Sequence, residues 1–253
     1  MVRMSGTTIT LEPAPFSGVT LVGGGPGDPD LITVAGLRAL AAADVVVTDR
    51  LAPGDLIASL SPHVELIDVA KVPRSRFTAQ ENINAVLIER AKAGKCVVRL
   101  KGGDNFVFGR GFEEVLALRD AGIPVRVIPG LSSSVAVPAL AGIPLTHRGV
   151  VHDFTVISGH LPPGHPDSLV DWTPLAALHG TLVLMMAVQN AGAIADALIA
   201  GGRSGEQPAA VITDGSLPSE RVVRTTLAQL GAAITADRIE PPAIIVIGDV
   251  VGL

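Results

Sequence analysis

The stretch VRLKGGDNFVFGRGFEE, residues 98–114, is the most informative segment of this chain. An apolar strand leads into Gly102-Gly103-Asp104, and Arg110 and Glu113 open a predicted helix beyond a Phe-rich turn. Paired glycines let a ligand approach the backbone where a side chain would collide with it. Because ligands of α/β proteins bind outside the carboxyl ends of strands, we expect this loop to line a ligand site.

Apolar strands alternate with helices on both sides of this stretch. In the first half the predicted strands are 19–23, 44–48, 64–69, 96–101 and 124–128, and the predicted helices are 31–42, 53–59, 79–92, 109–121 and 132–141. This alternation favours an α/β fold with parallel strands. In the second half the predicted strands are 153–158, 181–186, 209–213, 221–226 and 243–248, and the predicted helices are 190–200 and 227–236. Two of these strands follow one another without a helix, so the second sheet is predicted to be mixed.

The composition changes at residues 142–152, which is the best candidate for a linker. We therefore expect an N-terminal α/β domain at 18–147 and a C-terminal α/β domain at 148–253. Residues 1–17 contain prolines and small polar residues, and this composition is typical of a disordered tail.

Bulk composition limits the possible classes of protein. The chain has 253 residues, is 48% hydrophobic and has a net charge of −5, which disfavours a nucleic-acid partner. It contains neither the apolar run of a membrane span nor an evident secretory signal, so we expect no membrane partner. A single cysteine, Cys96, excludes an internal disulfide and fits a cytoplasmic protein.

The basic residues are unevenly distributed. Nine of the 19 Lys and Arg residues lie between Lys71 and Arg110, against three acidic residues there. Some of them could decorate the exposed face of the helix at 79–92. Alternatively, Lys71, Lys101 and Arg110 could surround an anionic ligand.

Several other polar residues stand at predicted strand ends or helix starts. Asp49 ends the second strand and Lys71 follows the third, and each either faces a ligand or lies in a surface turn. The serines at 132–134 either cap a helix or bind a ligand with their hydroxyls. Met186 ends a strand and is either a core residue or a ligand contact.

Other common sites do not fit the sequence. The glycine loop at 23–27 lacks the third glycine of a dinucleotide fingerprint and the Gly-Lys-Ser/Thr of a P-loop. Residues 130–134 lack the last glycine of a nucleophile elbow. The six histidines show no metal-ligand spacing, so we expect no metal.

Five motifs occur in an order that resembles one family. They are Gly25-Pro26-Gly27-Asp28-Pro29, Asp49-Arg50-Leu51, the 98–114 stretch, Pro129-Gly130 and the segment GIPLTHR at 142–148. Over about residues 18–251 the chain resembles the tetrapyrrole methylase family, and in particular its members that methylate uroporphyrinogen III.

The resemblance implies a two-domain class III methyltransferase fold with the active site in the cleft between the domains, and a homodimer. It implies that S-adenosylmethionine donates two methyl groups, leaving S-adenosylhomocysteine. Carbons 2 and 7 of uroporphyrinogen III would be methylated to give precorrin-2 through precorrin-1, which feeds sirohaem and cobalamin synthesis.

The resemblance also assigns roles to individual positions. The cofactor contacts would be Pro26, Gly102, Gly103, Asp104, Val107, Ser132, Ser133, Met186 and Gly215. The catalytic residues would be Asp49 and Lys71, at positions proposed for proton transfer, and Arg110. The tetrapyrrole would also contact Glu113, Arg148 and His160. The chain departs from the family pattern at Ala70, Asn105 and Ala187, where glycine, proline and glycine are common.

The residues themselves agree with this reading. Eight substrate carboxylates would account for the local basic excess. Methyl transfer to a pyrrole carbon leaves a cation that must lose a proton, which gives a general base a defined task. The alternatives are a methylase of later corrin intermediates or of RNA, and a non-catalytic tetrapyrrole-binding protein. The acidic net charge disfavours RNA, and the retained charged residues favour an enzyme.

Overall fold

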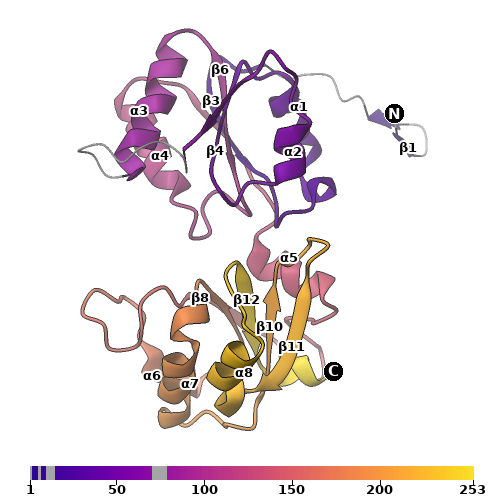
Figure 1. Ribbon diagram of the computed structural model, residues 1–253, viewed down its shortest axis with the longest axis vertical. Coiled ribbons are helices and arrows are strands. Elements are labelled where there is room, and N and C mark those ends of the chain that lie inside the picture. The colour runs from indigo at the N-terminus through magenta and orange to yellow at the C-terminus, as the bar shows by residue number, and fades with distance from the viewer. Residues whose placement is uncertain (1, 5–6, 10–14, 70–78) are drawn as a thin grey trace. The chain divides into compact units, whose positions relative to one another are not determined.

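The computed structural model describes residues 2–4, 7–9, 15–69 and 79–253. Contacts divide the chain into two units, Met1–Ser132 and Ser133–Leu253, and each unit has its own sheet and core. In Figure 1 the first unit is coloured from indigo to magenta, and the colours of the second unit continue to yellow at the C-terminus.

The first unit contains a five-stranded parallel sheet. Its strands are β3 (Gly18–Gly23), β4 (Val45–Thr48), β5 (Glu65–Asp68), β6 (Cys96–Lys101) and β7 (Val125–Ile128). They lie in the order β5-β4-β6-β3-β7, and every neighbouring pair is parallel. The parallel sheet expected from the alternating pattern is therefore confirmed, and the carboxyl ends of all five strands meet at one edge.

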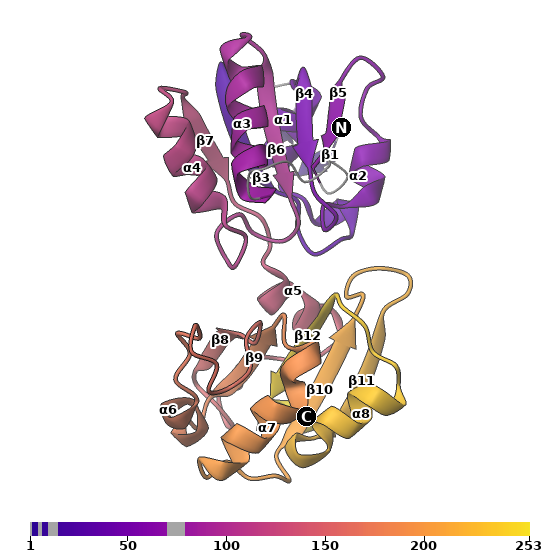
Figure 2. The ribbon, with the colours of Figure 1, turned by 60° about the vertical axis from the view of Figure 1, so that its left-hand side comes forward.

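Helices cover both faces of this sheet, as Figure 1 and Figure 2 show together. They are α1 (Val34–Ala41), α2 (Gly54–Ala58), α3 (Ala79–Lys92) and α4 (Gly111–Asp120). In β6, Val98 and Leu100 pack with residues of α1 and α2, whereas Val97 packs with residues of α3 and α4. This alternation follows from the two-residue period of a strand and leaves the strand buried on both faces.

The second unit contains a mixed sheet. Its strands are β8 (Phe154–Ser158), β9 (Thr181–Met185), β10 (Pro208–Thr213), β11 (Arg221–Thr226) and β12 (Ala243–Ile247). Their order is β11-β10-β12-β9-β8, with β8 parallel to β9 and the other pairs antiparallel. The mixed sheet predicted for this half is confirmed.

One face of the second sheet is covered by three helices, α6 (Trp172–Ala177), α7 (Ala191–Ala200) and α8 (Leu230–Ala236). Helix α6 was not predicted, because it has six residues and includes a proline, so it shows no helical periodicity. Its N-terminus is capped by Asp171, whose Oδ1 accepts a hydrogen bond from Thr173 N at 3.2 Å.

Helix α5 (Ser133–Leu140) covers the other face of the second sheet. Val137 and Ile143 are buried in a cluster with residues of β9, β10 and β12, and this packing places α5 in the second unit. The division therefore falls earlier than the boundary at 147/148, which rested on composition alone.

The N-terminal segment contains two short strands, β1 (Val2–Met4) and β2 (Thr7–Ile9), which pair antiparallel. This pair lies inside the segment 1–17 for which disorder was predicted. Among the helices that the structure describes, none combines the length and apolar character needed to cross a membrane.

Candidate active site

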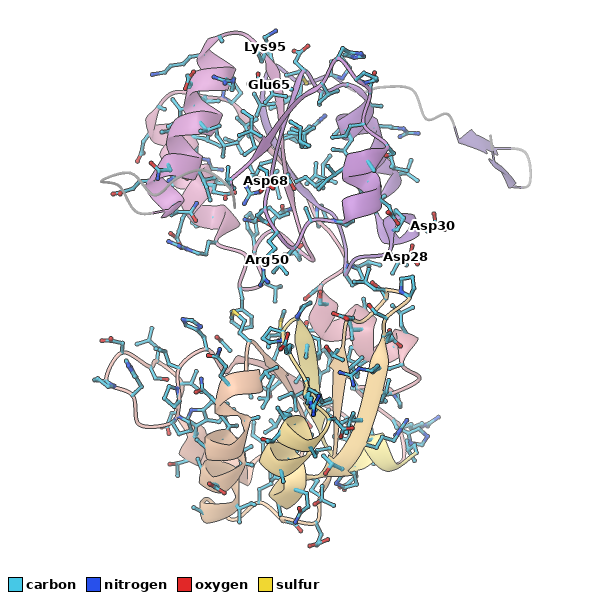
Figure 3. All side chains as sticks on the ribbon, viewed as in Figure 1. Asp28, Asp30, Arg50, Glu65, Asp68 and Lys95 are labelled. Carbon is cyan, nitrogen blue, oxygen red and sulfur yellow. The ribbon has the colours of Figure 1, made fainter. Side chains whose placement is uncertain are left out.

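The carboxyl edge of the first sheet gathers most of the residues that the sequence singled out. Figure 3 labels the two ends of the sheet: Glu65 and Lys95 lie at one end, and Arg50 and Asp68 lie at the other. Glu65 begins β5 and Asp68 ends it, so the end with Arg50 and Asp68 is the carboxyl edge. The loops that contain Pro26, Asp49 and Gly102 all leave the sheet there.

Glycines let three loops pack backbone to backbone at this edge. Gly25 and Gly103 form a bridge in which Gly103 N donates to Gly25 O at 2.6 Å and Gly25 N donates to Gly103 O at 3.2 Å. A Cβ on Gly130 would lie 2.2 Å from Gly103 O and 2.6 Å from the carbonyl carbon of Gly23. Gly102 is equally constrained, since a Cβ there would lie 2.3 Å from Leu51 O. The close packing of these loops is therefore enough by itself to explain why glycine stands at positions 102 and 130.

Asp104 ties these loops together. Its Oδ1 accepts hydrogen bonds from Phe106 N at 2.8 Å and from Val107 N at 3.2 Å, and its Oδ2 accepts one from Gly130 N at 3.3 Å. The carboxylate therefore fixes its own loop and joins it to the loop after β7. This leaves Val107 38% exposed beside the exposed ring of Phe106, as an apolar surface on a rigid loop.

Asn105, where the family commonly has proline, is fully buried in the same loop. Its Nδ2 donates to Ile128 O at 2.8 Å, and its backbone oxygen accepts from Gly111 N at 3.0 Å. Asn105 therefore connects the loop to β7 and to the start of α4.

Arg110 and Glu113 form an exposed ion pair at the start of α4. Arg110 has a left-handed backbone with φ 56° and stands at the N-cap of the helix. Its Nε lies 2.9 Å from Glu113 Oε1, and its Nη2 lies 2.6 Å from Glu113 Oε2. These hydrogen bonds raise the pKa of the Arg110 guanidinium and lower the pKa of the Glu113 carboxyl. The pair therefore presents a planar, oriented guanidinium at the surface.

Asp49 extends the alternation of β4 and holds a buried arginine that the sequence analysis did not select. Arg99 lies in β6 with its side chain 2% exposed, and its Nη2 is 2.8 Å from Asp49 Oδ2. Its Nε is 3.2 Å from Oε1 of the fully buried Glu114 in α4. The available signal was charge: Arg99 stands between the apolar residues Val98 and Leu100 in β6, and a charged residue at such a position needs buried partners.

Lys101 is also buried and contacts the same carboxylate. Its Nζ lies 3.3 Å from Glu114 Oε1. Burial lowers the pKa of the Lys101 ammonium, the nearby Arg99 charge lowers it further, and Glu114 opposes the shift. Lys101 is therefore not a surface residue that binds an anionic ligand, which was one interpretation of the basic cluster between Lys71 and Arg110.

The structure describes some of the remaining predicted site residues, while others lie in a segment that it does not describe. Ser132 ends the first unit and Ser133 begins α5 in the second. Lys71 and Ala70 lie outside the described residues. Arg148 is exposed, and its backbone oxygen lies 2.7 Å from His152 Nε2.

Three candidates of the second unit follow strands that point to the same edge of its sheet. His160, Met186 and Gly215 come after β8, β9 and β10 respectively. Asn190 joins two of these loops, because its Nδ2 donates to Gly159 O at 2.8 Å and to His160 O at 3.1 Å. Met186 has φ 56° and is 48% exposed, so its side chain is available to a ligand.

Two small residues set the packing of these loops. A Cβ on Gly215 would lie 2.4 Å from Val137 Cγ1, so glycine lets α5 pack closely there. Ala187, where the family commonly has glycine, is buried, and a Cβ on Gly159 would lie 2.5 Å from the Ala187 Cβ.

Over the described part of the chain, no cluster of three or more His, Cys, Asp and Glu residues could hold a metal ion.

Known proteins with similar sequences and folds agree with the resemblance noted from the sequence motifs. A relative from Methanocaldococcus jannaschii named uroporphyrinogen-III C-methyltransferase is 45% identical over 236 residues, which cover 93% of this chain and 97% of the relative. The structure of uroporphyrin-III C-methyl transferase from Thermus thermophilus complexed with S-adenyl homocysteine superposes with a TM-score of 0.77 at 41% identity, covering 93% of this chain and 99% of that one.

A cobalt precorrin-4 methyltransferase superposes with a TM-score of 0.84 at 29% identity, covering 93% of this chain and 96% of that one. Residues 18–231 match the family described as Tetrapyrrole (Corrin/Porphyrin) Methylases. Because that match spans most of the chain and includes every glycine loop of the first sheet, the chain belongs to the tetrapyrrole methylase family.

Proposed function

We propose that this protein transfers methyl groups from S-adenosylmethionine to carbons 2 and 7 of uroporphyrinogen III, giving precorrin-2 through precorrin-1. The observation that carries the proposal is the 45% identity to a protein named uroporphyrinogen-III C-methyltransferase over nearly the full length of both chains. The arrangement at the carboxyl edge of the first sheet supports it, because it combines a rigid glycine loop, a partly exposed carboxylate and an oriented guanidinium.

The residues present fit the methyl donor. An adenosyl group needs apolar walls with a few backbone polar groups, and the loop at 102–107 offers both, with Val107 38% exposed. We assign the cofactor contacts of the first unit to this loop, Pro26 and Ser132. Those of the second unit are Ser133, Met186 and Gly215. When bound, S-adenosylmethionine supplies an electrophilic sulfonium methyl group.

Asp49 is the proposed general base. Attack on the methyl group makes the pyrrole cationic, and the ring regains neutrality by losing a proton. The Asp49 side chain is 29% exposed, so part of it faces outward while Oδ2 is held by Arg99. Because Asp49 Oδ1 also accepts from Leu51 N at 3.1 Å, the carboxylate has a defined orientation.

The other charged candidates are assigned to the tetrapyrrole. Arg110, oriented by Glu113, holds a substrate carboxylate or orients the reacting ring. Lys71 acts as an anion anchor, and Arg148 and His160 contact the substrate from the second unit. Uroporphyrinogen has eight carboxylates, so several cationic contacts would be used at once.

A methylase of later corrin intermediates is the main alternative, since the cobalt precorrin-4 enzyme shares the fold with a TM-score of 0.84. Its identity is 29%, against 41% for the uroporphyrin enzyme, and substrate choice depends on side chains more than on fold. The test is anaerobic incubation with uroporphyrinogen III and labelled S-adenosylmethionine, with mass analysis of the tetrapyrrole. A gain of two methyl groups is expected, and a gain of one or none would contradict the proposal.

We also propose that the protein acts as a homodimer in the cytoplasm, as its family membership and its free Cys96 suggest. Sedimentation of the purified protein at several concentrations should give a mass near twice 25.9 kDa. A mass near 25.9 kDa at every concentration would contradict the dimer.

A further inference from the structure

The buried side of Asp49 is lined by residues to which the family resemblance assigns no role. Strand geometry explains why they meet: Arg99 pairs with Val47 across the sheet, and Asp49 follows two residues later on the same face. The Arg99 side chain therefore runs under the end of β4 and reaches Asp49 Oδ2 at 2.8 Å.

The Arg99 guanidinium is fixed by acceptors on three elements. Its Nη1 donates to Leu100 O at 3.0 Å and to Val47 O at 3.4 Å, and its Nε donates to Glu114 Oε1 at 3.2 Å. With Nη2 on Asp49, the planar fork has only one orientation that satisfies all these partners.

Glu114 holds the far end of this network. It is fully buried, and Oε1 lies within 3.4 Å of Gln80 Nε2 and within 3.3 Å of Lys101 Nζ, in addition to Arg99. Two cations and one amide thus converge on a single carboxylate oxygen. Glu114 belongs to α4, so the helix that begins at the 102–110 loop also fixes the arginine behind Asp49.

Stability alone gives a poor account of this arrangement. Burying two cations and a carboxylate carries a large desolvation cost, and an apolar substitute of similar volume is often at least as stable. The neighbouring Val97 and Val47 show that apolar side chains fit this face of the sheet. A buried network that ends on a partly exposed carboxylate is better explained by the need to hold that carboxylate in place.

We propose that Arg99 is a positioning residue for Asp49, and that Glu114 is the buried anchor that orients Arg99. The inference rests on the proposed function of Asp49 as the base. Its consequence is that Arg99 contributes to turnover only through Asp49 and contacts neither substrate nor cofactor.

The test is a double-mutant cycle with Arg99→Lys and Asp49→Asn, measuring kcat and KM for uroporphyrinogen III. Lysine keeps the charge but loses the fork, and a displacement of about 1 Å can reduce turnover by about 10²-fold. We expect Arg99→Lys to lower kcat at least ~10-fold in the wild-type background, with KM and S-adenosylhomocysteine affinity unchanged. In the Asp49→Asn background the same substitution should lower kcat by less than about threefold, because the effects of residues that act as a unit are not additive.

Arg90→Lys is the matched control, because Arg90 makes an exposed ion pair with Glu65 in the same unit, at 2.8 Å. It should leave kcat unchanged. If Arg99→Lys does not fold, as judged by circular dichroism, Glu114→Gln replaces it in the cycle. Glutamine retains an oxygen acceptor but removes the anchoring charge, and its loss of kcat should again disappear in the Asp49→Asn background.

Several outcomes would overturn the inference. They are full kcat in Arg99→Lys, full kcat in Asp49→Asn, or losses that multiply in the double variant, which would mean that Arg99 acts independently of Asp49. A wild-type protein that fails to methylate uroporphyrinogen III would instead contradict the proposed function, so the two failures are distinguishable.

Discussion

Gly130→Ala tests the backbone packing that holds the candidate site together. A Cβ at this position would lie 2.2 Å from Gly103 O, 2.6 Å from Gly23 C and 2.7 Å from Gly23 Cα. Non-bonded heavy atoms prefer separations of roughly 3.5 Å, so the loops would have to move apart by about 1 Å. All three neighbours are backbone atoms, so no side chain can rotate away to relieve the overlap.

The expected cost has two parts. Overpacking of a tight contact costs about 1–3 kcal/mol. Moving the loop also strains the hydrogen bond from Gly130 N to Asp104 Oδ2, and a bond to a charged group contributes about 1.5–3 kcal/mol. Partial loss of that bond gives a total near 2–4 kcal/mol, which for a slope of about 2 kcal/mol/M lowers the urea midpoint by roughly 1–2 M.

The measurement is urea unfolding followed by far-UV circular dichroism, combined with calorimetric titration of S-adenosylhomocysteine at low urea. We expect the lower midpoint together with weakened ligand binding. Gly54→Ala is the control, because Gly54 is exposed at the start of α2 and a Cβ there meets nothing within 4 Å. An unchanged midpoint for Gly130→Ala would refute the close packing of the three loops.

Three further results are expected. Asp49→Asn should reduce kcat by roughly 10²–10⁴-fold with the fold intact, whereas Lys71→Ala should mainly raise KM for the tetrapyrrole; the reverse pattern in steady-state kinetics would exchange their roles. An NMR titration should give Glu113 a pKa below the ordinary glutamate value. The ion pair with Arg110 therefore contributes to stability above the ordinary glutamate pKa, and this contribution is lost as pH falls through the lowered pKa. Arg110→Gln should abolish the shift, and an unshifted pKa of Glu113 in the wild type would exclude the pair. Arg203→Met should lower the free energy of unfolding by about 3 kcal/mol without changing the KM for the tetrapyrrole. The reason is that Arg203 is buried and donates hydrogen bonds to the backbone oxygens of Leu175, Leu178 and Gly180. A variant with the thermal stability of the wild type would contradict that role.

The first sheet and most of the strands and helices could be predicted from the sequence, because they depend on local pattern. Strands of Val, Ile and Leu that alternate with helices favour parallel strands, and the missing helix between β10 and β11 favoured an antiparallel pair. Helix α6 escaped prediction because it has only six residues and one of them is Pro174, a residue more typical of a turn or loop. The carboxyl edge as the place of the candidate site also followed from the sequence, since parallel strands bring their following loops together.

Tertiary structure alone decided which residues meet. The sequence marks Asp49 and the glycine loops as special, but Arg99 and Asp49 are 50 residues apart, and Gln80 and Glu114 are 34 apart. The glycines suggested an approaching ligand, and the structure shows that neighbouring backbone already requires glycine at 23, 102 and 130. Periodicity reports which face a residue occupies and not which distant residue lies opposite on that face. The pairing of buried charges and the contacts between loops depend on strand order and register, and these are properties of the whole folded sheet.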